Sequence, residues 1–152
     1  MASVKERYRY FAEALATWLR NNATLATLTG YTPTTLTILM YDTEEELPET
    51  CLGFAVLRCQ PMHAEVDLGL YEAEVLLVAR APERSAALDI MGAAEGLAAQ
   101  NATTRADAEF HDTHVTTQGI QWKGARDRFA AKESERGGFI SDGTLTIQWR
   151  ET

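Results

Sequence analysis

The stretch YEAEVLLVARAPERSAALDIMGAAEGLA, residues 71–98, carries two hydrophobic periods in direct succession. From Tyr71 to Ala79 every second residue is apolar, which is the pattern of a strand with one buried face. We therefore expect a strand that ends at Arg80, a proline at position 82 in the first helical turn, and a helix that runs to about Gln100 across the strands. The apolar stripe of this helix, with spacings of three and four, consists of Ala87, Ile90, Met91, Ala94, Leu97 and Ala98.

Upstream of Tyr71 the alternation changes face. The apolar residues there occupy even positions, from Ala64 to Leu70, whereas the following ones occupy odd positions. A strand that covered all of residues 63–80 would also exceed the usual length of three to ten residues. We therefore expect a break or bulge close to Gly69, with residues 70–80 forming the better strand.

Helix and strand patterns flank this stretch on both sides. Residues 3–21 have helical spacing and begin with Ser3 and Glu6, which fit a capping box. The sequence ATLATLTG, residues 23–30, predicts a short second helical turn. Strand patterns are found at residues 35–41 (with Leu36, Ile38 and Met40 on the apolar face), 51–59, 114–122 and 139–150.

The predicted order is helix, strand, strand, strand, helix, strand, strand, with hairpin-compatible connections between consecutive strands. This order indicates an α+β fold: a mostly antiparallel sheet of four to five strands packed against two main helices. A long charged hairpin loop is expected at residues 123–138, and the sequence SDG at residues 141–143 is interpreted as turn chemistry. Because no repeat or linker divides the chain, we expect one domain over residues 1–152.

Composition excludes several classes of protein. The formal charge of -8 opposes binding to nucleic acids or anionic lipid, since such binding relies on Lys and Arg neutralising phosphates. The chain has no run of 18 apolar residues and no secretory signal, so we expect cytosolic synthesis and no membrane partner. Cys51 and Cys59 are too few and wrongly spaced for a redox pair or a zinc knuckle, and we expect free thiols.

Catalytic motifs are not recognisable in the sequence. His111 and His114 are three residues apart, which on a strand directs their side chains to opposite faces and disfavours a shared metal ion. No serine elbow and no glycine-rich phosphate loop is present. We therefore predict no catalytic residues, no cofactor and no metal, and we interpret the protein as a non-enzyme.

Two charged segments are the candidate interaction sites. Residues 42–49 contain five carboxylates and no basic residue, and they lack the residue order of a calcium loop, which favours a solvated or partner-facing loop. Residues 123–138 contain five basic and three acidic side chains, a net charge of +2, and either contact a partner or form a disordered insertion. The candidate protein-interface residues are Asp42, Glu44, Glu45, Glu46, Glu49, Lys123, Arg126, Arg128, Phe129, Lys132 and Arg136.

The pattern resembles the tail terminator (tail completion) proteins of long-tailed bacteriophages, including the minor tail protein U group. The resemblance spans the opening helix, YDTEEELPETCLGFAVLRC (residues 41–59), the step VLLVARAP (residues 75–82) and the last strand DGTLTIQWRET (residues 142–152). It implies a virion protein, made in the bacterial cytoplasm, that forms a homo-oligomeric ring, usually a hexamer. Such a ring caps the tail tube protein and offers a surface to the head–tail connector protein.

Two other interpretations stay open. The chain is small enough to be another neck or connector component of the same kind of particle. Alternatively, it is a small-molecule binding domain or enzyme with a pocket between the helix at residues 82–100 and the sheet. Trp18, Tyr71 and Trp122 are the aromatic residues that would line such a pocket, although aromatic residues at these positions are more often part of the core.

Overall fold

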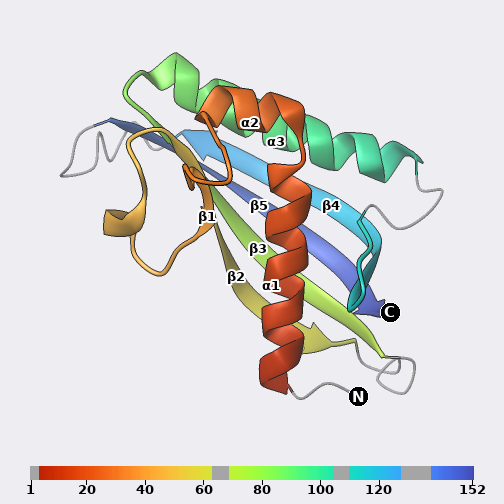
Figure 1. The fold of residues 1–152 in the computed structure, drawn as a ribbon. Helices are drawn as coiled ribbons and strands as arrows, with labels where there is room; N and C mark the ends of the chain where they lie inside the picture. Colours follow the sequence, from red (N-terminus) through yellow and green to blue (C-terminus); the bar gives the residue numbers. More distant parts are fainter. Residues whose placement is uncertain (1–3, 63–68, 105–109, 128–137) are drawn as a thin grey trace.

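A computed structural model describes residues 4–62, 69–104, 110–127 and 138–152 of the chain (Figure 1). Its elements follow the predicted order, with a short 3₁₀ helix added between the first two strands. They are α1 (Val4–Arg20), α2 (Ala23–Thr29), β1 (Ile38–Met40), η1 (Glu44–Glu46), β2 (Cys51–Pro61), β3 (Leu70–Ala81), α3 (Arg84–Thr104), β4 (Val115–Asp127) and β5 (Phe139–Glu151).

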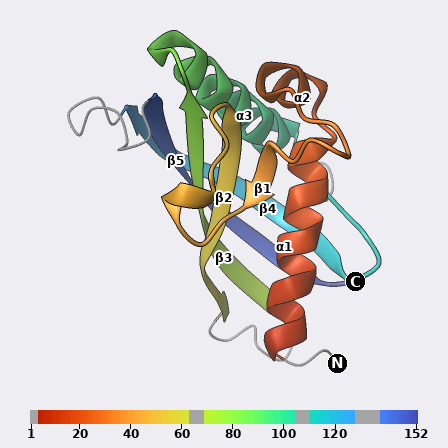
Figure 2. The same cartoon turned by 60° about the vertical axis from the view of Figure 1, so that its left-hand side comes forward.

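The five strands form one sheet in the order β1-β2-β3-β5-β4. Strands β2, β3, β5 and β4 pair antiparallel, which confirms the predicted α+β class. Strands β1 and β2 pair parallel, so the expected hairpin between them is wrong. Parallel neighbours require a longer connection, and residues 41–50, which include η1, provide it (Figure 2).

The main core lies between the helices and one face of the sheet. The alternation from Tyr71 to Ala79 is confirmed, because all five odd positions of this part of β3 are buried. Trp149 of β5 is fully buried and stacks on Phe11 of α1 with ring centroids 5.3 Å apart. Five members of the predicted stripe on α3 are buried, while Leu97 is half-buried against the core. Figures 1 and 2 show that α1, α2 and α3 all cover this face.

A smaller cluster covers part of the opposite face of the sheet. Tyr41, directly before the acidic segment, and Leu47, within it, pack there with Cys51, Val78 and Ile140. Gly53 makes this close approach possible, since a Cβ atom at that position would lie 2.5 Å from Leu47 Cδ2 and 2.8 Å from Tyr41 Cδ1. The connection between β1 and β2 is therefore fastened onto the sheet.

The predicted charged loop begins later in the chain than expected. Strand β4 continues to Asp127, so Lys123 and Arg126 are strand residues, and residues 128–137 of the predicted loop lie outside the described part. The SDG sequence is also not a turn, because residues 141–143 lie within β5 and pair with both neighbouring strands. A Cβ atom on Gly143 would lie 2.6 Å from Met91 Sδ and 2.7 Å from Trp122 Cη2, so this glycine permits close packing of α3 and β4.

Smaller expectations were also corrected. Of the apolar face predicted at residues 35–41 only Ile38 is buried, whereas Leu36, which precedes β1, and Met40 are 53% and 54% exposed, so this prediction is wrong. Pro82 lies before α3, because the Glu83 carbonyl accepts the Ala87 N–H at 3.2 Å and the helix begins at Arg84.

The boundaries of α2 and β3 are marked by glycines with positive φ. The side chain of Asn22 caps α2, and Gly30 ends it with φ 72°. Gly69 has φ 68° directly before β3, in agreement with a break at this position. Ser3 of the expected capping box and residues 63–68 lie outside the described residues.

Candidate functional site

The acidic segment has a fixed backbone and mostly exposed carboxylates. Arg80 of β3 is only 3% exposed, and its Nη1 donates hydrogen bonds to the carbonyls of Leu47 at 2.8 Å and Pro48 at 3.4 Å. Among the five predicted interface carboxylates of this segment, Glu44 is half-buried and the others are exposed: Asp42, Glu45, Glu46 and Glu49. The segment therefore presents negative charge from an anchored support.

A calcium or other metal site is not supported. No group of three or more His, Cys, Asp or Glu side chains within residues 4–62, 69–104, 110–127 and 138–152 is arranged to hold a metal ion. His111 Nδ1 instead lies 2.8 Å from the hydroxyl oxygen of Thr116, and His114 stacks on Tyr10. Both histidines thus have structural contacts.

The described part of the basic segment lies on the outer strand β4. Lys123 and Arg126 are exposed, and Arg126 Nε lies 3.4 Å from Asp142 Oδ2 on β5. Ser141 adds a hydrogen bond from its hydroxyl to the Arg126 carbonyl at 2.9 Å. The other predicted interface residues of this segment lie outside the described residues: Arg128, Phe129, Lys132 and Arg136.

The strand order separates the two charged segments at the level of the sheet. The acidic segment joins β1 to β2 at one edge, and β4 forms the other edge. With about 4.8 Å between neighbouring strands, β1 and β4 are about 19 Å apart. Edges of opposite charge would be complementary in a head-to-tail contact between copies.

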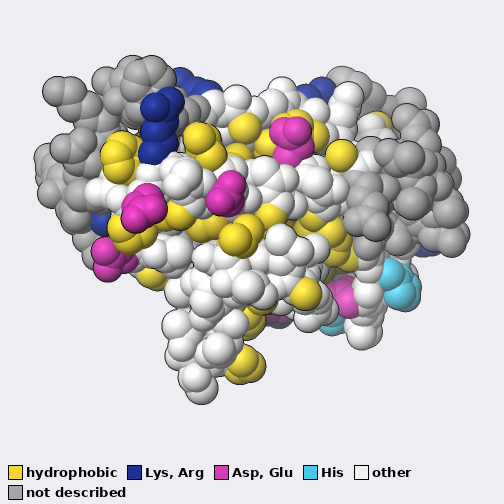
Figure 3. All heavy atoms as spheres, turned by 90° about the horizontal axis from the view of Figure 1, so that it is seen from above, with side chains coloured by type: hydrophobic (Ala, Val, Ile, Leu, Met, Phe, Trp, Pro, Cys, Tyr) yellow, Lys and Arg dark blue, Asp and Glu magenta, His cyan; other side chains and the backbone are white. Residues whose placement is uncertain are grey.

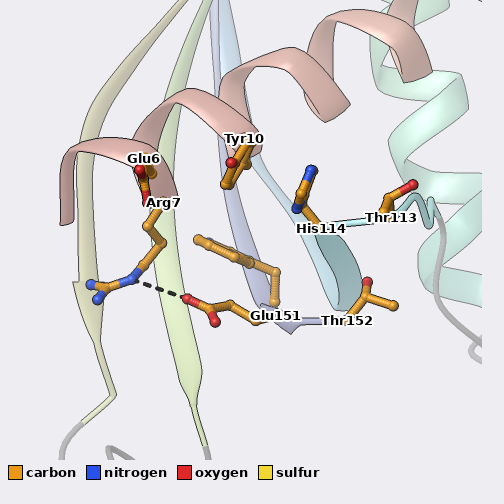
Figure 4. A pocket seen from close by; sticks show the side chains of 8 residues that line it. Glu6, Arg7, Tyr10, Thr113, His114, Glu151 and Thr152 are labelled. Carbon is orange, nitrogen blue, oxygen red and sulfur yellow. Dashed lines mark ion pairs between the residues drawn. The ribbon is translucent and has the colours of Figure 1, made fainter. Parts of the chain in front are cut away.

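One hollow of about 260 Å³ lies where α1 meets the ends of β4 and β5 (Figure 4). Arg7 Nε lies 3.6 Å from Glu151 Oε1, and the Arg7 guanidinium carbon is 4.4 Å from the centroid of the Tyr71 ring. Tyr10 and His114 stack with ring centroids 3.7 Å apart. These contacts join the first turns of α1 to β3, to β5 and to the residue before β4, and we interpret the hollow as part of the structural support of α1.

A second hollow of about 600 Å³ is a groove between α1 and the outer edge of β1 and β2. Small residues of α1 and apolar residues of the strands form much of its lining, and charged residues also line it. The apolar lining includes Ala12, Ala16, Met40, Phe54 and Val56, and the charged lining consists of Arg9, Glu13, Arg20 and Asp42. The sequence interpretation missed this groove, although Ala12 and Ala16 form a small-residue pair at helical spacing.

The aromatic pocket considered as an alternative does not form from the expected residues. Tyr71 is buried in the main core, and Trp18 and Trp122 are half-buried against it. Cys59 is also no activated nucleophile, because burial raises the pKa of its thiol, against the smaller lowering effects of Trp149 and Arg7. The described geometry thus offers no support for an enzymatic centre.

The helices α2 and α3 form the upper side of the molecule in Figure 1. Hydrophobic side chains are spread over this side among few charged ones (Figure 3). Leu28 of α2 and Leu88 of α3 are 37% and 43% exposed. No helix among the described residues combines the length and the hydropathy needed to cross a bilayer.

Comparison with known proteins adds a likeness of fold. No protein-family model and no curated protein matches the chain. Among solved structures, a chain of the "Virion of native gene transfer agent (GTA) particle" matches with a TM-score of 0.52 and 16% sequence identity. The match covers 92% of each chain, so the two proteins share their fold over nearly their whole lengths.

Proposed function

We propose that this protein is a structural component of a phage-like virion and acts as a tail terminator. In this role a ring of six copies caps the tail tube, stops its polymerisation and joins the tube to the head connector. The observation that carries the proposal is the shared fold with a chain of a gene transfer agent virion over 92% of both chains. The lack of a recognisable catalytic centre in the described residues agrees with an assembly role.

In this proposal the two charged segments are complementary sides of one subunit contact. A closed ring of identical subunits requires a heterologous contact, in which one surface meets a different surface of the next copy. The acidic segment and the basic end of β4 provide two such surfaces, at opposite edges of the sheet. The net charge of -8 also suits a channel through which DNA passes without adhering to basic walls.

The proposal is tested with purified protein and purified tail tube protein. Size-exclusion chromatography with light scattering should show a ring or a concentration-dependent oligomer, and added protein should shorten tubes seen by negative-stain electron microscopy. The double variant Arg126→Glu with Arg128→Glu should weaken both effects without changing the circular dichroism spectrum. Arg150→Glu, a charge reversal at an exposed position on β5, serves as the control and should assemble normally.

Unaltered assembly by the double variant would remove residues 126 and 128 from the proposed contact. An oligomer that leaves tube length unchanged but binds the head connector would instead identify another neck component of the particle. A protein that stays monomeric at its highest soluble concentration and in the presence of tubes would contradict the ring altogether.

A further inference from the structure

The groove between α1 and the β1–β2 edge has the properties of a protein contact. Ala12 and Ala16 are nearly buried and make the α1 side of the groove shallow, while Met40 is 54% exposed on the strand side. Exposed methionine next to small residues provides an apolar surface that adapts to an incoming side chain. Charged residues stand beside the apolar lining, unlike in a pocket for a small apolar ligand.

Beside the groove, most of the outer edge of β2 has no strand partner among the described residues. Strand β1 pairs only with Leu52, Gly53 and Phe54, although β2 continues to Pro61. The N–H of Cys59 on this edge donates to the Tyr8 hydroxyl at 2.8 Å. Tyr8 of α1 therefore accepts a hydrogen bond that the carbonyl of a neighbouring strand would otherwise accept. Exposed strand edges of this kind are places where another chain can attach.

Asp42 at the rim of the groove offers a carboxylate to a basic occupant. Arg9 pairs with Glu13 at 3.8 Å, and Arg20 donates to the Ile38 carbonyl at 2.9 Å. Asp42 is exposed at the groove, and no cation within the described residues forms an ion pair with its carboxylate. The four lining charges cancel in sum, but the Asp42 carboxylate stays open to an incoming cation.

The opposite edge of the same sheet carries a matching group. Lys123 of β4 is exposed, and no carboxylate of the described residues pairs with its ammonium group. Gly124 follows with φ 129° at a break in the register with β5, and Gly124 and Ala125 are exposed. The irregular backbone here makes a long continuous sheet across two copies unfavourable. It leaves a short basic segment exposed at the edge of the sheet.

A chain cannot insert its own β4 into its own groove. Strand β4 is paired to β5 as far as Asp127, and β3 and β5 separate it from β2. A β4 segment in this groove must therefore come from another copy, and in the proposed ring this contact is heterologous.

We propose that the Lys123–Gly124–Ala125 segment of a neighbouring copy lies in the α1/β2 groove, with its Lys123 ammonium group at Asp42. This inference rests on the proposed ring and specifies where neighbouring subunits contact each other. The stem of Lys123 lies on the apolar lining while its charge meets the carboxylate at the rim. Repetition of this contact joins each copy to the next in the same sense.

Cysteine cross-linking tests the contact directly. Met40→Cys places a thiol in the groove, and Ala125→Cys places one on β4. The two single variants, mixed before assembly and treated with a short bismaleimide, should give a band of twice the chain mass, whereas each variant alone should not. Wild-type protein measures the background from Cys51 and Cys59, which is low because Cys51 is buried and burial raises the pKa of Cys59.

A second pair of cysteine positions and an exchange of the two proposed ion-pair charges serve as controls. Met40→Cys mixed with Leu88→Cys, an exposed position on α3, should not cross-link. Asp42→Lys in the Met40→Cys copy, or Lys123→Glu in the Ala125→Cys copy, should reduce the yield at least tenfold, and mixing the two double variants should restore it. A restored yield identifies the ion pair, because a folding defect would not be repaired by a second reversal.

The outcomes separate this inference from the proposed function. Oligomers that form without the 40–125 cross-link would overturn the groove contact and leave the ring intact. Cross-linking of Met40→Cys with itself would show a symmetric contact and overturn the head-to-tail arrangement. A chain that never oligomerises, with or without tubes, would overturn both.

Discussion

Replacing Leu47 with alanine should loosen the acidic segment from the sheet. Leu47 is fully buried and packs over the bare backbone of Gly53 in the small cluster on the helix-free face. The substitution removes three buried carbon groups at about 0.8 kcal/mol each, which amounts to roughly 2.4 kcal/mol. A cavity contribution adds to this loss, but a surface segment can settle into part of the space. We expect the free energy of unfolding to fall by about 2.5–3.5 kcal/mol.

Thermal unfolding followed by circular dichroism measures this loss. For a chain of this size each kcal/mol lowers the Tm by about 2–4 °C, so the expected decrease is about 5–14 °C. Leu57→Ala is the matched control, because Leu57 on β2 is 56% exposed and the same change there should cost less than about 0.5 kcal/mol. Equal effects of the two substitutions, or a Leu47→Ala loss below about 1 kcal/mol, would refute the anchoring of the segment.

Two further predictions concern packing and thiol chemistry. Gly143→Ala should lower the free energy of unfolding by about 1–3 kcal/mol in urea titrations, because the new Cβ atom would meet Met91 and Trp122 at 2.6 and 2.7 Å. Gly92→Ala on α3, with nothing within 4 Å, should instead raise it by up to about 1 kcal/mol, and the opposite order would contradict the packing. Because burial raises the pKa of Cys59, its thiol stays protonated in the folded protein at pH values where an exposed thiol begins to ionise, about 8.5. Iodoacetamide should therefore modify Cys59 more slowly in the folded than in the urea-unfolded chain, and equal rates at pH 8.5 would exclude the shift.

The parts of the fold that were predicted from sequence are those that bury one regular apolar face. Strand β3 alternates over its predicted length because its odd positions face α1 and α3, and the spacing on α3 changes to three and four because a helix buries a stripe. The break close to Gly69 was likewise predicted, and Gly69 has φ 68° directly before β3. These signals depend on side chains alone.

The errors arose where backbone hydrogen bonds or close packing decide the structure. Lys123 and Arg126 are polar and looked like loop residues, but both lie in the outer strand β4 with exposed side chains. Arg126 pairs with Asp142 of β5, and Lys123 lies at the register shift between Trp122 and Gly124. Gly143 looked like a turn glycine, but it lies in β5 under Met91. The parallel pairing of β1 with β2 was not visible either, since only three residues of β1 take part.

The proposed subunit contact was predictable only in part, because it combines residues that are distant along the chain. The charge of the acidic segment is apparent from sequence, but its anchoring by Arg80 and Leu47 is not. Anchoring changes the interpretation of that charge. A segment held in place loses little conformational freedom on binding, so its carboxylates favour a specific contact more than a flexible acidic loop would. The groove adds an apolar surface beside the exposed carboxylate of Asp42. In the proposed contact the charge of Asp42 favours a basic partner segment, and burial of the apolar surface stabilises the complex.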